Sequence, residues 1–144
     1  MSIVATQNEN EKSLVVRFQH YAETMKSDFE ASLDLLSDDI VWVNLLPANV
    51  PFGGKYVGKQ EVVRYFTLLA EAFVIGEHHW EKFDFIESGN TLVMVGSEDE
   101  GKVISTGKVF DLNFVWVIRF DDDGKICYVR EHNDTAAIGD AFKV

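Results

Sequence analysis

The sequence lacks a second cysteine and a surplus of basic residues, and each shortage excludes a class of protein. Its one cysteine, Cys127, excludes an intramolecular disulfide, and its apolar, strand-like surroundings favour a packing role. The 13 lysines and arginines are outnumbered by 24 acidic residues, which gives a formal net charge of −11 without any basic run. Because this charge repels phosphate groups, we expect neither nucleic acid nor a membrane surface as a partner.

Long apolar stretches are also missing. No run of 18 apolar residues occurs, and the first residues, MSIVATQNENEK, have neither a basic start nor an apolar stretch of signal length. We therefore expect a cytoplasmic location. What is present is a chain of 144 residues, 47% of them hydrophobic, with charges in short groups, which is typical of one globular domain. We expect a flexible segment over residues 1–10 and a single domain over 11–144.

The order of the predicted elements indicates the fold class. Three segments show the three-and-four spacing of amphipathic helices, namely 11–26, a short one opening at Ser27 with a capping box ending at Glu30, and 60–75. Strands are predicted over 40–46, 80–87, 91–98, 103–120 and 125–133, and the short turns between the later strands favour antiparallel pairing. This order predicts an α+β domain whose helices pack on one face of an antiparallel sheet.

The segment 109–120 divides its side chains between two faces. One face is apolar and should meet the helices: Leu112, Phe114, Trp116 and Ile118. The opposite face is mixed and suits a homodimer contact: Asp111, Asn113, Val115, Val117 and Arg119. A strongly curved sheet would leave an apolar cavity beneath Phe114, Trp116 and aromatic residues of the first helix such as Phe18. A filled core without a cavity is the alternative.

Three segments resemble the SnoaL-like branch of the nuclear-transport-factor-two-like superfamily, especially its members related to ketosteroid isomerase. They are SDFEASLDLLSDDIVW, PFGGKYVGKQEVVRYF and FVWVIRFDDDGKICYVREHNDTAAI, and the resemblance covers residues 11–140. It implies a cone-shaped, cystatin-like fold in which N-terminal helices pack on a strongly curved antiparallel sheet around an apolar pocket. One fold can host many functions, so the chemistry depends on the residues in the pocket.

The residues at the isomerase positions depart from the family's catalytic set. Ketosteroid isomerase uses a general-base aspartate and an oxyanion site of tyrosine and protonated aspartate. Counted along the resembling segments, the base falls on Asn44, the oxyanion acid on Trp116 and the tyrosine on His20 or Tyr21. Asparagine cannot abstract a proton, and tryptophan offers only an indole donor. We therefore exclude steroid isomerisation by the familiar arrangement.

Related polyketide cyclases carry an acidic base on the last strand, a few residues after an Asp-Gly turn, and that position is Glu131 here. The resemblance turns the face of Glu131 inward, among the aromatic residues, where burial would raise its pKa and suit it to take a proton from a carbon acid. The alternative is a rim residue paired with lysine or arginine, or a structural hydrogen-bond acceptor. The residues expected to share its face are Cys127, Val129 and Asn133, and those expected around the ligand are Phe18, Trp42, Phe114, Trp116, Val129 and Asn133.

Two functions remain open. In the first, the chain is a cofactor-independent isomerase or cyclase, in which Glu131 moves a proton of an apolar, carbonyl-bearing substrate. The oxygen of this substrate would be positioned by Asn44, Asn133 and either His20 or Tyr21. In the second, the same pocket holds a small hydrophobic ligand, or the sheet face holds a protein, without turnover. A deep pocket with Glu131 buried and lacking a cationic partner favours the enzyme.

We expect no cofactor and no functional metal. His78 and His79 are adjacent, so on an extended chain they point to opposite sides, and a turn or surface pair is the expected role. The acidic turn over 121–124 lacks carboxylates at the ends that a calcium loop requires. No Walker loop or dinucleotide fingerprint occurs.

Overall fold

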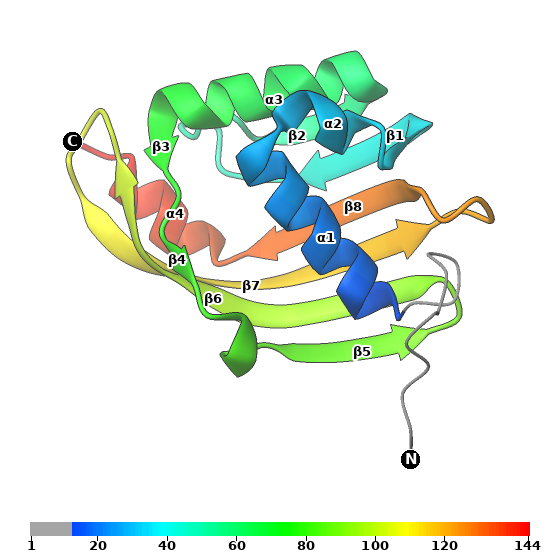
Figure 1. Ribbon diagram of the computed structural model, residues 1–144. Helices are drawn as coiled ribbons and strands as arrows, with labels where there is room; N and C mark the ends of the chain where they lie inside the picture. Colours follow the sequence, from blue (N-terminus) through cyan, green and yellow to red (C-terminus); the bar gives the residue numbers. More distant parts are fainter. Residues whose placement is uncertain (1–12) are drawn as a thin grey trace.

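The computed structural model describes residues 13–144 (Figure 1). The helices are α1 (Leu14–Ser27), α2 (Phe29–Leu33), α3 (Lys59–Ala72), the single 3-10 turn η2 (Trp80–Lys82) and α4 (Thr135–Ala141). The strands are β1 (Leu36–Asn44), β2 (Gly54–Val57), β3 (Phe73–Val74), β4 (Glu77–His78), β5 (Asp84–Ser88), β6 (Thr91–Val103), β7 (Val109–Phe120) and β8 (Ile126–Asn133). The predicted flexible segment 1–10 lies outside the described residues.

One sheet organises the molecule. Its strands follow the order β2-β1-β8-β7-β6-β3, and β4 and β5 also pair with β6. All pairs are antiparallel except β1 with β8, which is parallel because the long connection through α3 and the meander brings the last strand beside the first. The predicted α+β architecture with helices on a curved, mainly antiparallel sheet is confirmed.

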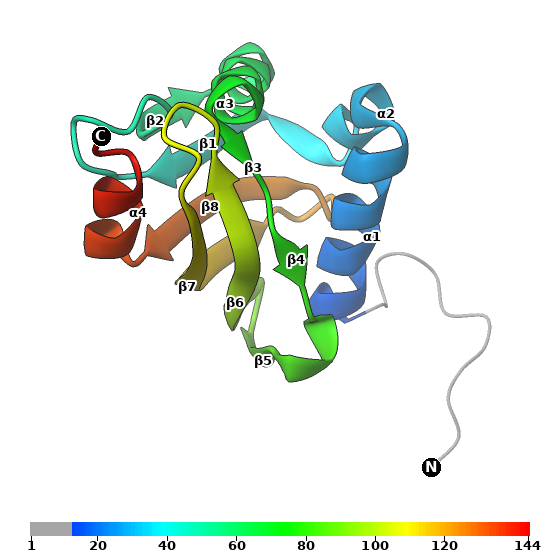
Figure 2. The same ribbon diagram turned by 90° about the vertical axis from the view of Figure 1, so that its left-hand side faces the viewer.

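The helices lie on the concave face of the sheet. In Figure 1, α1 crosses in front of the strands and α3 runs above β1 and β2. Figure 2, turned by a quarter, shows the sheet bending around the space below α3, with α1 on one side and α4 near the end of β8. Ser13 caps α1 and Asp28 caps α2. Each side chain accepts a backbone N–H of its helix, so the first turn of both helices is fixed locally.

Several predicted boundaries are wrong for reasons that lie in tertiary structure. Ser27 does not open a capping box, because it ends α1 and its hydroxyl donates to the carbonyl of Glu23. The predicted turn over 99–101 is a bulge within β6, where the Asp111 carboxylate accepts the N–H of Glu100. The strand expected over 80–87 begins at Asp84, after the turn η2. Strand β2 and helix α4 were not predicted.

The two faces of β7 differ as predicted. On the concave side Leu112, Phe114 and Ile118 are buried and Trp116 is half-buried. On the convex side the residues from Asp111 to Arg119 are exposed or half-buried, with Val95 of β6 opposite Val115. The homodimer through this face stays a prediction. None of the helices within residues 13–144 is long and apolar enough to cross a membrane, and the cytoplasmic location also stays a prediction.

Candidate functional site

The concave side of the sheet encloses a cavity of about 380 Å³. Its wall is mostly aromatic and aliphatic and comes from α1, α3, α4 and the inner face of β1, β6, β7 and β8. Exposed Lys26 and Ile75, which is 46% exposed, also line it and mark its opening. A volume of this size suits a small organic molecule, so the filled-core alternative does not hold.

Glu131 lies in the wall of this cavity with 9% of its surface exposed. Its Oε2 accepts a hydrogen bond from Trp42 Nε1 at 2.8 Å and one from Tyr65 OH at 2.6 Å. Both bonds end on Oε2. Among residues 13–144 no lysine or arginine forms an ion pair with this carboxylate. The burial of Glu131 contradicts the predicted alternative of a rim residue, while the other alternative, a structural hydrogen-bond acceptor, stays open.

Burial raises the pKa of Glu131 to about 7, because the charged carboxylate loses its hydration inside the protein. Hydrogen bonds from Tyr65, Trp42 and Asn133 oppose this change by stabilising the charged form, and the negative charge of Glu98 adds to it. A carboxyl group with such a pKa exchanges its proton near neutral pH, which is the property that a general base requires.

A chain of hydrogen bonds holds the carboxylate from behind. Asn133 Nδ2 donates to Asn44 Oδ1 at 2.9 Å, and Asn44 Nδ2 donates to Tyr65 OH at 3.0 Å. Because the tyrosine hydroxyl accepts from Asn44, its own hydrogen is directed to Glu131. Asn44 is 2% exposed, so it acts mainly as a support for Tyr65.

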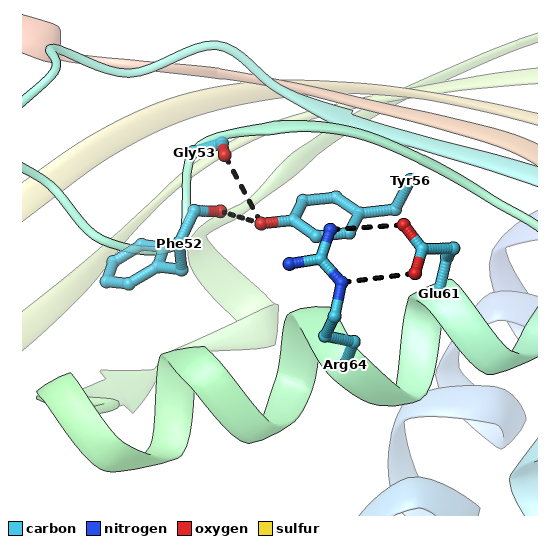
Figure 3. Close-up of polar contacts among 5 residues, drawn as sticks. All are labelled: Phe52, Gly53, Tyr56, Glu61 and Arg64. Atoms are coloured by element: carbon cyan, nitrogen blue, oxygen red, sulfur yellow. Dashed lines mark hydrogen bonds and ion pairs between the residues drawn. The ribbon is translucent and has the colours of Figure 1, made fainter.

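A second layer, between β2 and α3, fixes Tyr65. Figure 3 shows Tyr56 of β2 donating its hydroxyl hydrogen towards the carbonyls of Phe52 and Gly53, at 3.0 and 3.2 Å. The guanidinium of Arg64 lies 4.9 Å from the centre of the Tyr56 ring and binds Glu61 through two nitrogens. The Tyr56 and Tyr65 rings lie 5.0 Å apart. This packing leaves the Tyr65 ring little freedom to turn away from Glu131.

An unused hydrogen-bond donor lies beside this carboxylate. Trp116 pairs with Glu131 across β7 and β8, and both residues line the cavity. The Trp116 Nε1 is buried and has no hydrogen-bond partner within the described chain. An unpaired buried donor costs about 1–3 kcal/mol, so a ligand oxygen at this nitrogen would stabilise the protein.

The structure places the remaining predicted residues as follows. Tyr21 faces the cavity, its hydroxyl donates to the weak acceptor Met25 Sδ at 3.6 Å, and burial raises its pKa. His20 is exposed and does not line this cavity. Val129 is buried but is not part of the cavity wall, and a bulge opposite Phe120 turns Cys127 away from the inner face. The other residues that line the cavity as predicted are Phe18, Trp42, Asn44, Phe114, Trp116 and Asn133.

Sequence reasoning missed three polar residues of the wall: Tyr65, His78 and Glu98. Tyr65 could have been found as a hydroxyl-bearing residue three positions after Val62 in the buried row of α3. The prediction that His78 belongs to a turn or surface pair is wrong, because it lies in β4 with its ring nitrogen 3.3 Å from Glu98. Within residues 13–144 no three histidine, cysteine or acidic side chains group closely enough to hold a metal ion.

Comparison with known proteins agrees with this geometry. Residues 18–129 match the family described as the SnoaL-like domain. No curated protein matches the chain.

Solved structures of the same shape support the fold. An NTF2-like protein from Burkholderia xenovorans shares 23% identity at a TM-score of 0.76, covering 97% of this chain and 100% of that one. A candidate isomerase from Rhodopseudomonas palustris shares 18% identity at a TM-score of 0.72, covering 89% and 98%. A protein from Xanthomonas campestris with a cystatin-like fold shares 23% identity at a TM-score of 0.69, covering 91% and 98%. The predicted cone-shaped fold is thereby confirmed.

Proposed function

The chain belongs to the SnoaL-like domain family, and from that premise we propose that it catalyses cofactor-independent proton transfer on an apolar, carbonyl-bearing small molecule. The observation that carries the proposal is Glu131, a buried carboxylate without a cationic partner in the described chain, which lies in the wall of an apolar cavity. Relatives of similar fold include a candidate isomerase, which agrees with an activity of this class.

The reaction step is a simple acid–base exchange. The Glu131 carboxylate takes a proton from the carbon next to the carbonyl, and the electrons of that C–H bond form the double bond of an enolate. The carbonyl oxygen then carries negative charge, and the protonated Glu131 can return its proton to another carbon, as in an isomerase. In a cyclase the enolate carbon instead attacks a second carbonyl of the same molecule.

The enolate oxygen needs hydrogen-bond donors. Trp116 Nε1 is available beside Glu131, and Tyr21 OH can exchange its weak contact with Met25 Sδ for a ligand oxygen. The indole N–H and the phenol O–H are weaker acids than a protonated carboxyl group, so they stabilise the developing charge less than a protonated aspartate would.

The alternative is a module that binds an apolar ligand without turnover. The same cavity supports it, and the absence of the isomerase carboxylates from Asn44 and Trp116 favours it. The two functions differ in whether a bound ketone exchanges its protons with solvent.

The test uses benzylacetone, a small ketone that carries a phenyl ring, in heavy water. Catalysed exchange of the protons next to its carbonyl for deuterium, followed by NMR, measures proton abstraction directly and does not depend on the natural substrate. We expect exchange above the buffer rate, and Glu131→Gln should lower it by roughly 10²–10⁴-fold, the usual contribution of a general base.

Two controls separate chemistry from binding. Glu71→Gln alters an exposed residue of α3 and should leave the exchange rate unchanged. Trp116→Phe should weaken binding of benzylacetone but not of butylbenzene, which has no carbonyl oxygen. Binding of benzylacetone with no exchange by the native protein would favour the non-catalytic module instead.

A further inference from the structure

A second polar group lies in the same cavity, in the wall made by β4 and β6. His78 Nε2 lies 3.3 Å from Glu98 Oε2, and both side chains line the cavity. Glu98 is 7% exposed, and its other oxygen, Oε1, accepts the backbone N–H of Gly76 at 3.2 Å. The proton-transfer step proposed above makes no use of this pair.

Local packing holds the pair in place. His78 and Glu98 are direct partners in the β4–β6 pairing, and a Cβ at Gly76 would collide with the carbonyl of Asp99, so only glycine allows this close approach. The His78 ring lies edge-on to three aromatic rings at centroid distances of 6.1 to 6.3 Å, those of Trp80, Phe83 and Phe114. A side chain enclosed in this way has one preferred orientation.

The contact with Glu98 determines which ring nitrogen carries the hydrogen. An ionised carboxylate only accepts hydrogen bonds, so the hydrogen of a neutral His78 ring lies on Nε2 and points to Glu98. The other nitrogen, Nδ1, then has a free lone pair, and within residues 13–144 no hydrogen bond to it is found. The pair therefore presents unused acceptors to the cavity.

The charge of the cavity selects the kind of ligand. Glu131 and Glu98 are both buried in its wall, and the charge of Glu98 is close enough to raise the pKa of Glu131. Lys26, the one lysine among the described residues that line the cavity, is exposed at the opening. An anionic group would meet two carboxylates in a region of low dielectric, so the acceptors of the pair suit a neutral hydroxyl donor.

The pair lies further along the inner face of the sheet than the row of residues that holds the base. Along the inner face, one row of neighbouring residues holds Met94, Trp116 and Glu131, and Glu98 lies two inward residues further along β6 than Met94. Four residues of extended strand span about 13 Å, which the curvature of the sheet reduces across the cavity. A ligand that contacts both Glu131 and the His78–Glu98 pair is therefore elongated.

We infer that the His78–Glu98 pair binds a hydroxyl group of the substrate, at a distance from the carbonyl that Glu131 and Trp116 contact. The substrate class is a neutral, elongated hydroxy-ketone with an apolar middle. This inference rests on the proposed function, since it takes the carbonyl end from it.

The test compares three ligands by calorimetric titration: benzylacetone, its para-hydroxy derivative and its para-methoxy derivative. The methoxy oxygen keeps the size and the acceptor but cannot donate a hydrogen bond. We expect the native protein to bind the hydroxy compound about tenfold more tightly than the methoxy compound, as a hydrogen bond to an otherwise unpaired acceptor allows.

Two variants test whether the His78–Glu98 pair causes the preference for the hydroxy compound. In His78→Phe the preference for the hydroxy compound should fall to about one, while benzylacetone itself binds as before, which also shows that the cavity is intact. Because Glu98 loses its partner in that variant, the double variant His78→Phe/Glu98→Gln removes the unpaired charge and should show the same loss of preference. A purely structural role would lower the binding of all three compounds together.

The outcomes distinguish the two proposals. Equal binding of the three compounds, with deuterium exchange still present, would overturn the hydroxyl site and leave the proton transfer standing. A preference that survives His78→Phe would overturn the assignment to this pair. Failure of every compound to bind would count against both proposals.

Discussion

Two glutamates lie buried in one cavity, with 9% and 7% of their surfaces exposed, but their partners differ. Glu131 is held by neutral donors, the Trp42 indole and the Tyr65 hydroxyl, whereas Glu98 is held by the His78 ring and a backbone N–H. Burial raises the pKa of Glu131, which has no cationic partner in the described chain, whereas Glu98 forms a polar pair with a histidine ring. The comparison shows that burial alone does not decide the role of an acidic residue.

The largest expected effect comes from removing each carboxylate in turn. Glu131→Gln should abolish nearly all exchange of benzylacetone protons, by roughly 10²–10⁴-fold, because the group that takes the proton is gone. Glu98→Gln should lower the exchange of benzylacetone far less, since this ligand carries no hydroxyl. Equal losses in the two variants would break the distinction between the two glutamates.

The next effect concerns stability against pH. The pKa of Glu131 is raised from 4.5 to about 7, so between these values the folded protein holds a proton that the unfolded chain releases. This contribution to the free energy of unfolding is full below 4.5 and is lost as pH rises through about 7, by roughly 3 kcal/mol. Chemical denaturation at several pH values should show this loss in the native protein and not in Glu131→Gln.

Many other acidic groups also change stability over this range, so the informative quantity is the difference between the native protein and Glu131→Gln at each pH. Glu71→Gln should follow the native protein. A difference that does not vary between pH 4.5 and about 7 would show that Glu131 has an ordinary pKa.

A smaller effect is expected from the hydroxyl of Tyr65. Its hydrogen bond stabilises the charged form of Glu131, so Tyr65→Phe should raise the pKa of that carboxyl further. A hydrogen bond to a charged group is worth about 1.5–3 kcal/mol, which corresponds to a rise of roughly one to two pH units in the exchange profile. Tyr128→Phe, on the half-buried outer face, is the matched control and should leave the profile unmoved.

A substitution on the outer face of the sheet should have the smallest effect on the cavity. We expect a homodimer through this face, where Val95, Val115 and the 60% exposed Ile86 form an apolar strip. Light scattering should give the dimer mass for the native protein and the monomer mass for Val115→Lys, with deuterium exchange unchanged. Only monomer at micromolar concentration in the native protein would contradict the dimer.

Much of the cavity wall around Glu131 could be predicted from the sequence. The alternation of residues on 109–120 and 125–133, combined with the family resemblance, places Trp116, Glu131 and Asn133 on the inner face, and the structure agrees. The partner of the carboxylate, Tyr65, could not be deduced in this way, because it comes from a helix whose rotation is set by packing against β1 and β2.

The cavity wall around Glu98 and His78 could not be predicted, because its geometry depends on interruptions of regular secondary structure. The turn η2 separates His78 from β5, and the bulge near Glu100, which has a positive φ of 59°, keeps β6 continuous past Glu98. Both irregularities depend on distant contacts, such as the Asp111 carboxylate that binds the backbone of Glu100. A sequence pattern assigns such segments to turns and separates residues that the folded chain brings together.

The pH dependence of deuterium exchange tests the central claim most directly, since it reports the protonation of the group that takes the proton. With benzylacetone as the probe, we expect the exchange rate to rise with pH and to reach half its maximum near pH 7, the pKa of Glu131. Stability falls over the same range in which exchange increases. A half-maximum near the ordinary glutamate value of 4.5, or a profile that Glu131→Gln leaves unaltered, would contradict the account.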